Sequence, residues 1–184
     1  MNDLLMLALL LDGPKHGYAI KKQAGLMAGR ASMHNNLVYP LLRRFVAQHW
    51  VAQRETAGDR GQRRQVYSIT PRGRQALVER LSEFTDSDAR SGEAFRLRVG
   101  LFEILGPAAR QAILGNRKAF LETQDERLAR IEKGLNVGRY GAEAVGYMRR
   151  QIAAEIEWIE HLATLDSSHA RRSARKGRQR RSLR

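Results

Sequence analysis

Residues 36–70 decide the fold, and they read NLVYPLLRRFVAQHWVAQRETAGDRGQRRQVYSIT. Over residues 36–49 the apolar side chains recur at helical spacing, which predicts an amphipathic helix. The residues of this predicted buried stripe are Val38, Leu41, Leu42, Phe45 and Val46. The pattern then becomes β-rich and predicts strands over 50–56 and 63–70, joined by a glycine-containing turn at 57–62. The stretch therefore predicts one helix followed by a β-hairpin.

Helices are predicted on both sides of this stretch. Residues 2–11 are apolar nearly all round, which predicts a helix central to a core and ended by Asp12-Gly13-Pro14. A second helix is predicted over residues 16–27. Its expected buried residues are Tyr18, Ile20, Ala24 and Met27. Thr70-Pro71 is an N-cap followed by proline at the first helical position, so a fourth helix is expected to about residue 84. Three helices closed by a hairpin make a winged helix-turn-helix, whose third helix enters the major groove of DNA.

From residue 86 onward the sequence predicts only helices, over 93–105, 107–135 and 142–165. The last two carry apolar residues at three- and four-residue steps, which is the spacing of a packed helical seam. These seams are too extended for one subunit to cover, so we expect a two-fold homodimer. The predicted fold is mostly α with a small β-hairpin. Its expected parts are a winged helix-turn-helix DNA-binding domain at 1–85, a helical dimerisation domain at 86–168 and a basic disordered tail at 169–184.

The charge of the chain is strongly positive and unevenly distributed. There are 33 Lys and Arg residues against 19 Asp and Glu residues, which gives a net charge of +14. Residues 1–85 carry a net +7, residues 86–169 a net −1 and residues 170–184 a net +8. Such a surplus favours a polyanionic partner, either nucleic acid or an anionic membrane. The tail has too few apolar residues to fold, and it is either a solvated segment or a non-specific grip on phosphates.

Composition excludes several classes of protein. There is no cysteine, which excludes a disulfide scaffold, a Cys-ligated zinc finger and a thiol nucleophile. The five histidines show no paired spacing, which argues against a metal site. We find no nucleophile elbow, Walker loop or dinucleotide fingerprint, so neither an enzyme nor a cofactor is expected. The longest apolar run, Leu4–Leu11, is too short to span a membrane and lacks signal-peptide features, so a soluble cytoplasmic protein is expected.

Three short motifs occur in order along the N-terminal half of the chain. They are Gly13-Pro14-Lys15-His16-Gly17-Tyr18, then Tyr39-Pro40-Leu41-Leu42-Arg43, then Tyr67-Ser68-Ile69-Thr70-Pro71-Arg72-Gly73. Each motif alone is weak, but with this order and spacing residues 3–84 resemble the PadR family of bacterial transcriptional regulators. The resemblance implies a homodimeric repressor on a roughly palindromic operator, often released from DNA when a small aromatic effector binds.

Two places depart from the family's pattern. His34-Asn35-Asn36-Leu37 stands where the family usually has a Ser/Thr-Pro-Gly-Ser/Thr stretch, so the presumed base-reading residues differ and the operator sequence cannot be carried over. His49 replaces the glycine that usually ends the third helix. We therefore expect either an uncomfortable backbone conformation at His49 or a different helix end.

The candidate DNA-binding residues fall on elements that a winged helix presents to DNA. On the third helix, Asn is suited to adenine and Arg to guanine in the major groove. Arginines of the hairpin suit the phosphate backbone, and Lys15 and His16 lie at a helix start that can receive a phosphate. The candidate set is Lys15, His16, Tyr18, His34, Asn35, Asn36, Tyr39, Arg43, Arg60, Arg63 and Arg64. Tyr39 is expected either to hydrogen-bond a phosphate or to pack against the hairpin. Tyr67 is expected to lie in the core.

Two alternatives to a sequence-specific regulator stay open at this point. The tail and the hairpin could serve a non-specific nucleic-acid-binding or architectural protein. The unusual stretch at 34–37 also leaves open a small-molecule or protein-interaction module that has kept the fold and lost DNA binding.

Overall fold

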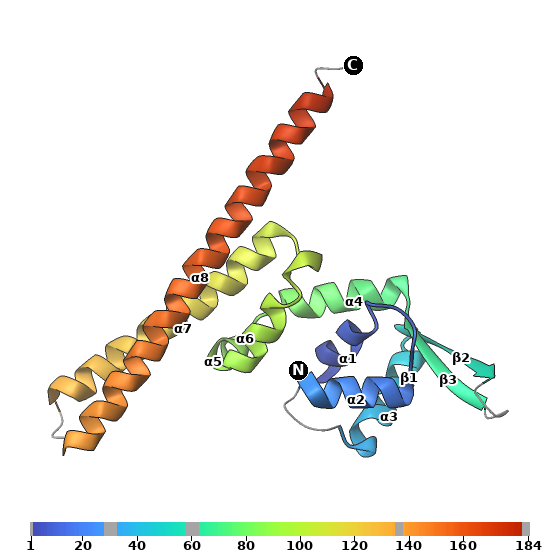
Figure 1. The fold of residues 1–184 in the computed structure, drawn as a ribbon, viewed down its shortest axis with the longest axis horizontal. Helices are drawn as coiled ribbons and strands as arrows, with labels where there is room; N and C mark the ends of the chain where they lie inside the picture. The colour runs from blue at the N-terminus through green and yellow to red at the C-terminus, as the bar shows by residue number, and fades with distance from the viewer. Residues whose placement is uncertain (1, 28–32, 58–62, 135–137, 182–184) are drawn as a thin grey trace. The chain divides into compact units, whose positions relative to one another are not determined.

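The computed structural model describes residues 2–27, 33–57, 63–134 and 138–181, with side chains as far as residue 165. The protein is mostly α-helical with a small antiparallel sheet, as predicted (Figure 1). Its contacts divide the chain into two compact units. The first unit comprises residues 1–83 and 96–105, and the second comprises residues 84–95 and 106–184.

The first unit is built on three helices, α1 (Asn2–Leu9), α2 (Gly17–Met27) and α3 (Asn35–Ala47). Helix α1 is buried nearly all round, as its apolar sequence predicts. Helix α3 buries four residues of the predicted stripe, namely Val38, Leu41, Leu42 and Phe45. Because a helix that buries one stripe must expose the other side, this packing fixes which face of α3 meets solvent.

Helix α2 buries a different set of residues from the one predicted. Its buried residues are Gly17, Ile20, Ala24 and Gly25. Tyr18 and Met27 are 70% and 60% exposed, so the prediction that they are buried is wrong. Tyr18 lies two residues before Ile20, on the opposite side of the helix, and Met27 is the last residue of α2, where the helix has passed the core.

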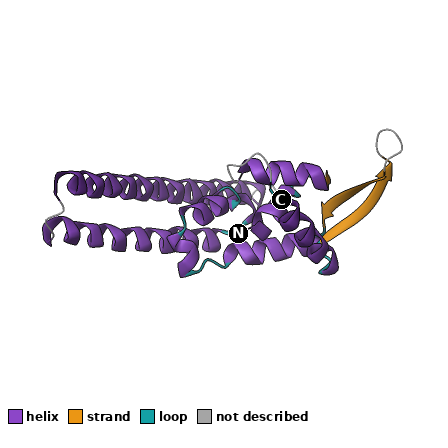
Figure 2. Ribbon diagram, turned by 90° about the horizontal axis from the view of Figure 1, so that it is seen from below, coloured by secondary structure: helices purple, strands orange, loops and turns teal. Residues whose placement is uncertain are grey.

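A three-stranded antiparallel sheet completes the first unit. Strands β2 (Val51–Ala57) and β3 (Arg63–Ile69) form the predicted hairpin, and both are drawn in orange in Figure 2. The predicted turn between them lies mostly outside the described residues. A third strand, β1 (Lys15–His16), pairs with the other edge of β3, so the strand order is β1-β3-β2. This strand was not predicted, because its two residues were assigned to the start of the second helix.

One backbone carbonyl, that of Trp50, sits where α3, the hairpin and α4 (Pro71–Ser82) meet. His49, just before it, has a φ of 58°, so it does adopt the left-handed conformation that favours glycine. The Trp50 carbonyl accepts a hydrogen bond from the Thr70 amide at 2.9 Å. The Thr70 hydroxyl lies 2.7 Å from the His49 carbonyl oxygen and accepts a hydrogen bond from the Gly73 amide at 3.0 Å, which makes Thr70 the predicted N-cap of α4. These bonds hold the start of α4 against the end of α3.

The second unit is helical. Its long helices, α7 (Pro107–Gly134) and α8 (Gly138–Arg181), run side by side (Figure 2). Helix α5 (Asp86–Arg90) was not predicted, although the capping box of Thr85 and Asp88 marks its start. The helix predicted over 93–105 is instead α6 (Gly92–Val99), which contributes to both units, followed by a short 3-10 turn (Phe102–Ile104).

Helix α8 is longer than the predicted helix over 142–165. Its backbone is helical as far as Arg181, which includes most of the segment 169–184 that was expected to be disordered. Arg, Lys, Ala and Gln dominate that segment, and all four have high helix propensity. The helical backbone therefore reflects local preference, since the segment has almost no apolar residues to pack.

Two buried arginines bond to main-chain carbonyls. In the first unit, Arg98 is 4% exposed and donates to the carbonyl oxygens of Leu81 and Glu83, at the C-terminal end of α4. In the second unit, Arg117 of α7 donates two hydrogen bonds of 2.9 Å to Glu155 of α8 and another to the Ala89 carbonyl of α5. The Glu155 carboxylate thereby neutralises a buried guanidinium.

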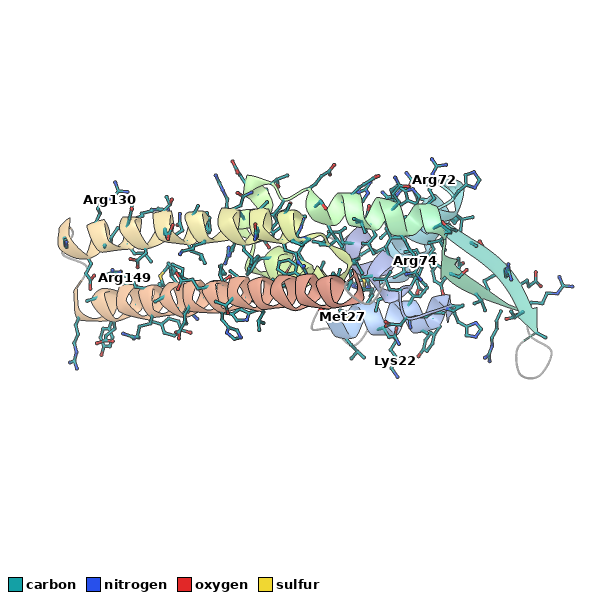
Figure 3. The ribbon with its side chains drawn as sticks, turned by 90° about the horizontal axis from the view of Figure 1, so that it is seen from above. Lys22, Met27, Arg72, Arg74, Arg130 and Arg149 are labelled. Carbon is teal, nitrogen blue, oxygen red and sulfur yellow. The ribbon has the colours of Figure 1, made fainter. Side chains whose placement is uncertain are left out.

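A second arginine cluster joins α7 and α8. Arg149 of α8 donates to both carboxylate oxygens of Asp125 at 2.9 and 3.1 Å, and to Glu132 at 2.8 Å (Figure 3). The hydrogen bonds from Arg149 hold the pKa of the Asp125 carboxyl below its ordinary value of 3.8. The cluster is partly exposed, so its contribution to stability is screened by solvent.

We expect Gly73→Ala to destabilise the first unit by about 1–3 kcal/mol. A Cβ atom at Gly73 would lie 2.0 Å from the Trp50 carbonyl oxygen, a backbone atom that cannot move without breaking the junction. Denaturant unfolding followed by tryptophan fluorescence measures the change. The matched control is Gly115→Ala in α7, where a Cβ atom meets nothing within 4 Å and a gain of about 0.5–1 kcal/mol is expected. Equal effects of the two substitutions would contradict the close approach at Gly73.

The Asp125–Arg149 pair predicts a loss of stability in acid. The folded-state pKa of Asp125 is lowered, so its contribution is complete above the ordinary carboxyl pKa of 3.8 and disappears as the pH falls through the lower folded-state value. As the pH falls through that acid range, the free energy of unfolding should therefore decrease less for Asp125→Asn than for the unmodified protein. Thermal unfolding at several pH values measures the difference. Glu157→Gln, which removes an exposed carboxylate elsewhere on α8, serves as the control and should follow the unmodified protein. Parallel curves for Asp125→Asn and the unmodified protein would show that the pair is not formed in solution.

Candidate nucleic-acid interface

The N-terminal end of α3 presents polar side chains to solvent. His34, Asn35 and Asn36 are all exposed. His34 occupies the N-cap position, but its side chain makes no capping hydrogen bond, so the imidazole is not used to start the helix. Tyr39 and Arg43 are exposed on the same side of α3, one and two turns further along. Amide, phenol and guanidinium groups therefore share one solvent-facing side of this helix.

Strand β1 brings two candidate residues next to β3. Its pairing places Lys15 opposite Tyr67 and His16 opposite Val66. His16 is exposed and Lys15 is half-buried. A Cβ atom at Gly17, the next residue, would lie 3.0 Å from the Tyr39 ring, so Gly17 allows the start of α2 to pack against α3. The structure thus brings Lys15 and His16 to the element that carries Tyr39.

Tyr67 is a core residue, as expected, and it lies near two candidates. Burial raises the pKa of the Tyr67 phenol, the nearby Tyr39 raises this pKa further, and Arg43 lowers it. Tyr39 and Arg43 are therefore close enough to the buried phenol to act on its charge. This proximity connects β3 with the exposed side of α3.

The described part of the hairpin carries two of its three candidate arginines. Arg63 and Arg64 are exposed on β3, whereas Arg60 lies outside the described residues. Arg63 forms an ion pair of 3.0 Å with Glu55 on β2, and its side chain is 84% exposed. An exposed pair of this kind is weak, so Arg63 can exchange Glu55 for another anion.

Several exposed cations of the first unit were missed by the sequence reasoning. They are Arg54 on β2, and Arg72 and Arg74 in the first turn of α4. Lys22 on α2 is also exposed, and its side chain points away from α2 in Figure 3. Arg72 lies within the third motif, so its place in the sequence could have identified it as a candidate DNA-binding residue. Tyr18, 70% exposed, is also available for contact.

Arg44 differs from Arg43 in being held by a carboxylate. It forms an ion pair with Asp3 of α1, and Asp3 also lies 3.6 Å from the Arg80 guanidinium of α4. Arg80 in turn stacks over the Trp50 ring at 4.9 Å. Nothing in the sequence pointed to a residue 41 positions away as the partner of Arg44.

The sequence profile of the Transcriptional regulator PadR-like family matches residues 6–79. These residues are similar to the PadR-like family. The match covers α1 to α4 almost entirely and contains all three motifs that suggested the resemblance. Members of the PadR-like family are transcriptional regulators and not enzymes, as the sequence led us to expect. A comparison with curated protein sequences finds no match.

Solved structures similar to this chain include other PadR regulators. A PadR family transcriptional regulator from Eggerthella lenta is 30% identical, with 41% of this chain and 66% of that chain covered and a TM-score of 0.35. A transcriptional regulator from Clostridium thermocellum is 23% identical over 47% of this chain and 84% of its own, with a TM-score of 0.42. Bacillus subtilis PadR in complex with operator DNA is 17% identical over 89% of this chain and 98% of its own, with a TM-score of 0.43. The similarity to the PadR-like family rests on the match over residues 6–79 rather than on these likenesses.

No helix among the described residues has both the length and the apolar character that crossing a membrane requires.

Proposed function

We propose that this PadR-like regulator is a cytoplasmic, bacterial repressor that binds a roughly palindromic operator as a homodimer. The observation that carries the proposal is the exposed side of α3, where Asn35, Asn36, Tyr39 and Arg43 face solvent inside the segment that matches the family. Asn and Arg are the side chains best suited to adenine and guanine edges in the major groove.

Each candidate residue has a proposed role in this complex. Asn35, Asn36 and Arg43 read base edges, and His34 contacts a base or a phosphate. The proposed backbone contacts are Lys15, His16, Tyr18, Tyr39, Arg60, Arg63 and Arg64. Arg54, Arg72 and Arg74 add positive charge to the same unit. Because phosphate contacts release counterions, affinity should fall steeply as salt rises.

A second copy of the chain is the proposed partner of the α7–α8 helix pair. Tyr147 and Met148 of α8 are 55% and 47% exposed. Ile152 and Ile156, one and two turns further along, line a groove with Glu122 and Arg150 at its edges. Apolar residues flanked by both signs of charge suit an isologous contact, in which an acidic edge of one copy meets a basic edge of the other. A two-fold dimer would also present two copies of α3 to two operator half-sites.

A small aromatic effector remains part of the proposal. Between α5 and α7 the second unit has an open groove of about 680 Å³, and Phe120, Arg90 and Arg127 are among its lining residues. A ring face with two guanidinium groups suits an aromatic anion. Calorimetric titration with aromatic carboxylates, on the unmodified protein and on Arg127→Ala, would detect such binding.

Arg43→Ala tests base reading by α3. We expect the substitution to relax base preference at one operator position by about 1–3 kcal/mol, because a bidentate contact to guanine is lost. Selection of bound sequences from genomic DNA, followed by binding measurements on single-base variants, gives the value. Arg130→Ala removes the same charge from the exposed side of α7 and should leave the preference unchanged. An equal loss on every sequence would show that Arg43 contacts only the backbone.

Removal of residues 170–184 separates this proposal from a non-specific binder that uses its basic tail. The shortened protein should keep its sequence-specific footprint and lose affinity mainly for unrelated DNA, because the tail carries eight cations and no acidic residue. Footprinting at several salt concentrations gives the answer. Complete loss of binding would favour the non-specific, architectural alternative. If the full-length protein forms no complex with its own upstream promoter region even at low salt, a domain that has lost DNA binding is favoured instead.

A further inference from the structure

Asp3 is an acidic residue that faces two arginines of the first unit. It lies in the first turn of α1, and its carboxylate bonds to Arg44 of α3 and lies near Arg80 of α4. Its side chain is 23% exposed, whereas those of Arg44 and Arg80 are 46% and 44% exposed. One carboxylate therefore faces two guanidinium groups at the solvent boundary.

The two arginines differ in what else holds them. Arg80 stacks over the Trp50 ring at 4.9 Å, which fixes it against the first unit even without Asp3. Arg44 lies over the ring of its buried neighbour Phe45, at 5.5 Å from the ring centroid. The ion pair with Asp3 directs the Arg44 guanidinium towards α1.

Arg44 adjoins the side of α3 that is proposed to read DNA. It directly follows Arg43, and the exposed residues of this helix include both of them together with Pro40 and Ala47. A long arginine at the flank of that side can reach a phosphate if nothing else binds it. In the structure its charge is instead directed towards α1.

We infer that Asp3 sets the general affinity of the protein for duplex DNA, which it lowers by withdrawing the Arg44 charge from the phosphate backbone. The inference rests on the proposed function, namely that α3 contacts DNA. Stability alone is a weak reason for the pair, because exposed salt bridges contribute little. A phosphate contact carries no sequence information, so removing one lowers affinity for all duplexes and leaves base reading to the remaining residues.

The test compares Asp3→Asn with Asp12→Asn in the full chain. Asparagine keeps the shape of the side chain and removes one negative charge in both variants. Asp12 lies in the exposed turn after α1 and has no ion pair among the described residues, so it controls for net charge. The probes are a duplex selected from genomic DNA by the unmodified protein and a scrambled duplex of equal length and composition. Affinity for each is measured across a range of salt concentrations.

Asp3→Asn should bind the scrambled duplex about fivefold to tenfold more tightly at 0.1 M salt, with a salt slope steeper by about one counterion. Its affinity for the selected duplex should rise by a similar factor, so the preference between the two duplexes stays the same. Asp12→Asn should leave both affinities almost unchanged. Adding Arg44→Gln to Asp3→Asn should abolish the gain, because Arg44 supplies it. Thermal unfolding and circular dichroism establish that each variant is folded.

The inference is overturned if Asp3→Asn and Asp12→Asn behave alike, or if the gain persists when Arg44 is replaced. Either result would leave sequence-specific binding by the unmodified protein intact. If the unmodified protein selects no duplex, the proposed function fails and this inference fails with it.

Discussion

The Trp50 carbonyl is the contact on which the arrangement of the first unit depends. It accepts a hydrogen bond from the Thr70 amide. Gly73 lies so close to it that a methyl group at position 73 would overlap the carbonyl oxygen. His49 takes up the left-handed conformation that turns the chain from α3 into β2. Because α3, the hairpin and α4 all meet at this point, these backbone bonds add to the apolar packing that holds the three elements together.

This junction gives α3 a fixed exposed side, and the chemistry of the unit follows from it. The buried stripe of α3 holds the helix on the core, β1 adds Lys15 and His16 beside β3, and Tyr67 lies under Tyr39 and Arg43. The exposed arginines of α3 differ in whether a carboxylate of the protein binds them. Arg43 faces solvent, whereas Arg44 is bound to Asp3, so neighbouring arginines on one helix have different surroundings. A rigid helix with differently restrained cations can separate base reading from general attraction to phosphate.

The sequence predicted the parts of this structure that depend on local pattern. The period of Val38, Leu41, Leu42 and Phe45 identified the buried stripe of α3, the change to alternating residues identified the hairpin, and Thr70-Pro71 identified the start of α4. Residues 6–79 are also those in which motif spacing suggested the family. The candidate residues on α3 followed from the same pattern, since residues that leave the apolar stripe must be exposed.

What the sequence did not predict depends on contacts between distant residues. Strand β1 is only two residues long and exists because β3 offers it an edge, so no local period marks it. The partners of Arg44, Arg98 and Arg117 lie 15 or more positions away, and a charged residue gives no sign of its own burial. Tyr18 was predicted to be buried, although it lies on the side of α2 opposite to the buried Ile20 and is exposed. Helix α5 is the exception, because its capping box was readable and was overlooked.

The most direct test of the account is a map of backbone amide signals by nuclear magnetic resonance as a genomically selected duplex is added to the full chain. Signals from the N-terminal half of α3, from β1 and from the hairpin arginines should change first and most strongly. Changes confined to α8 and its basic end, with α3 unaffected, would contradict the claim that α3 is the element that reads DNA.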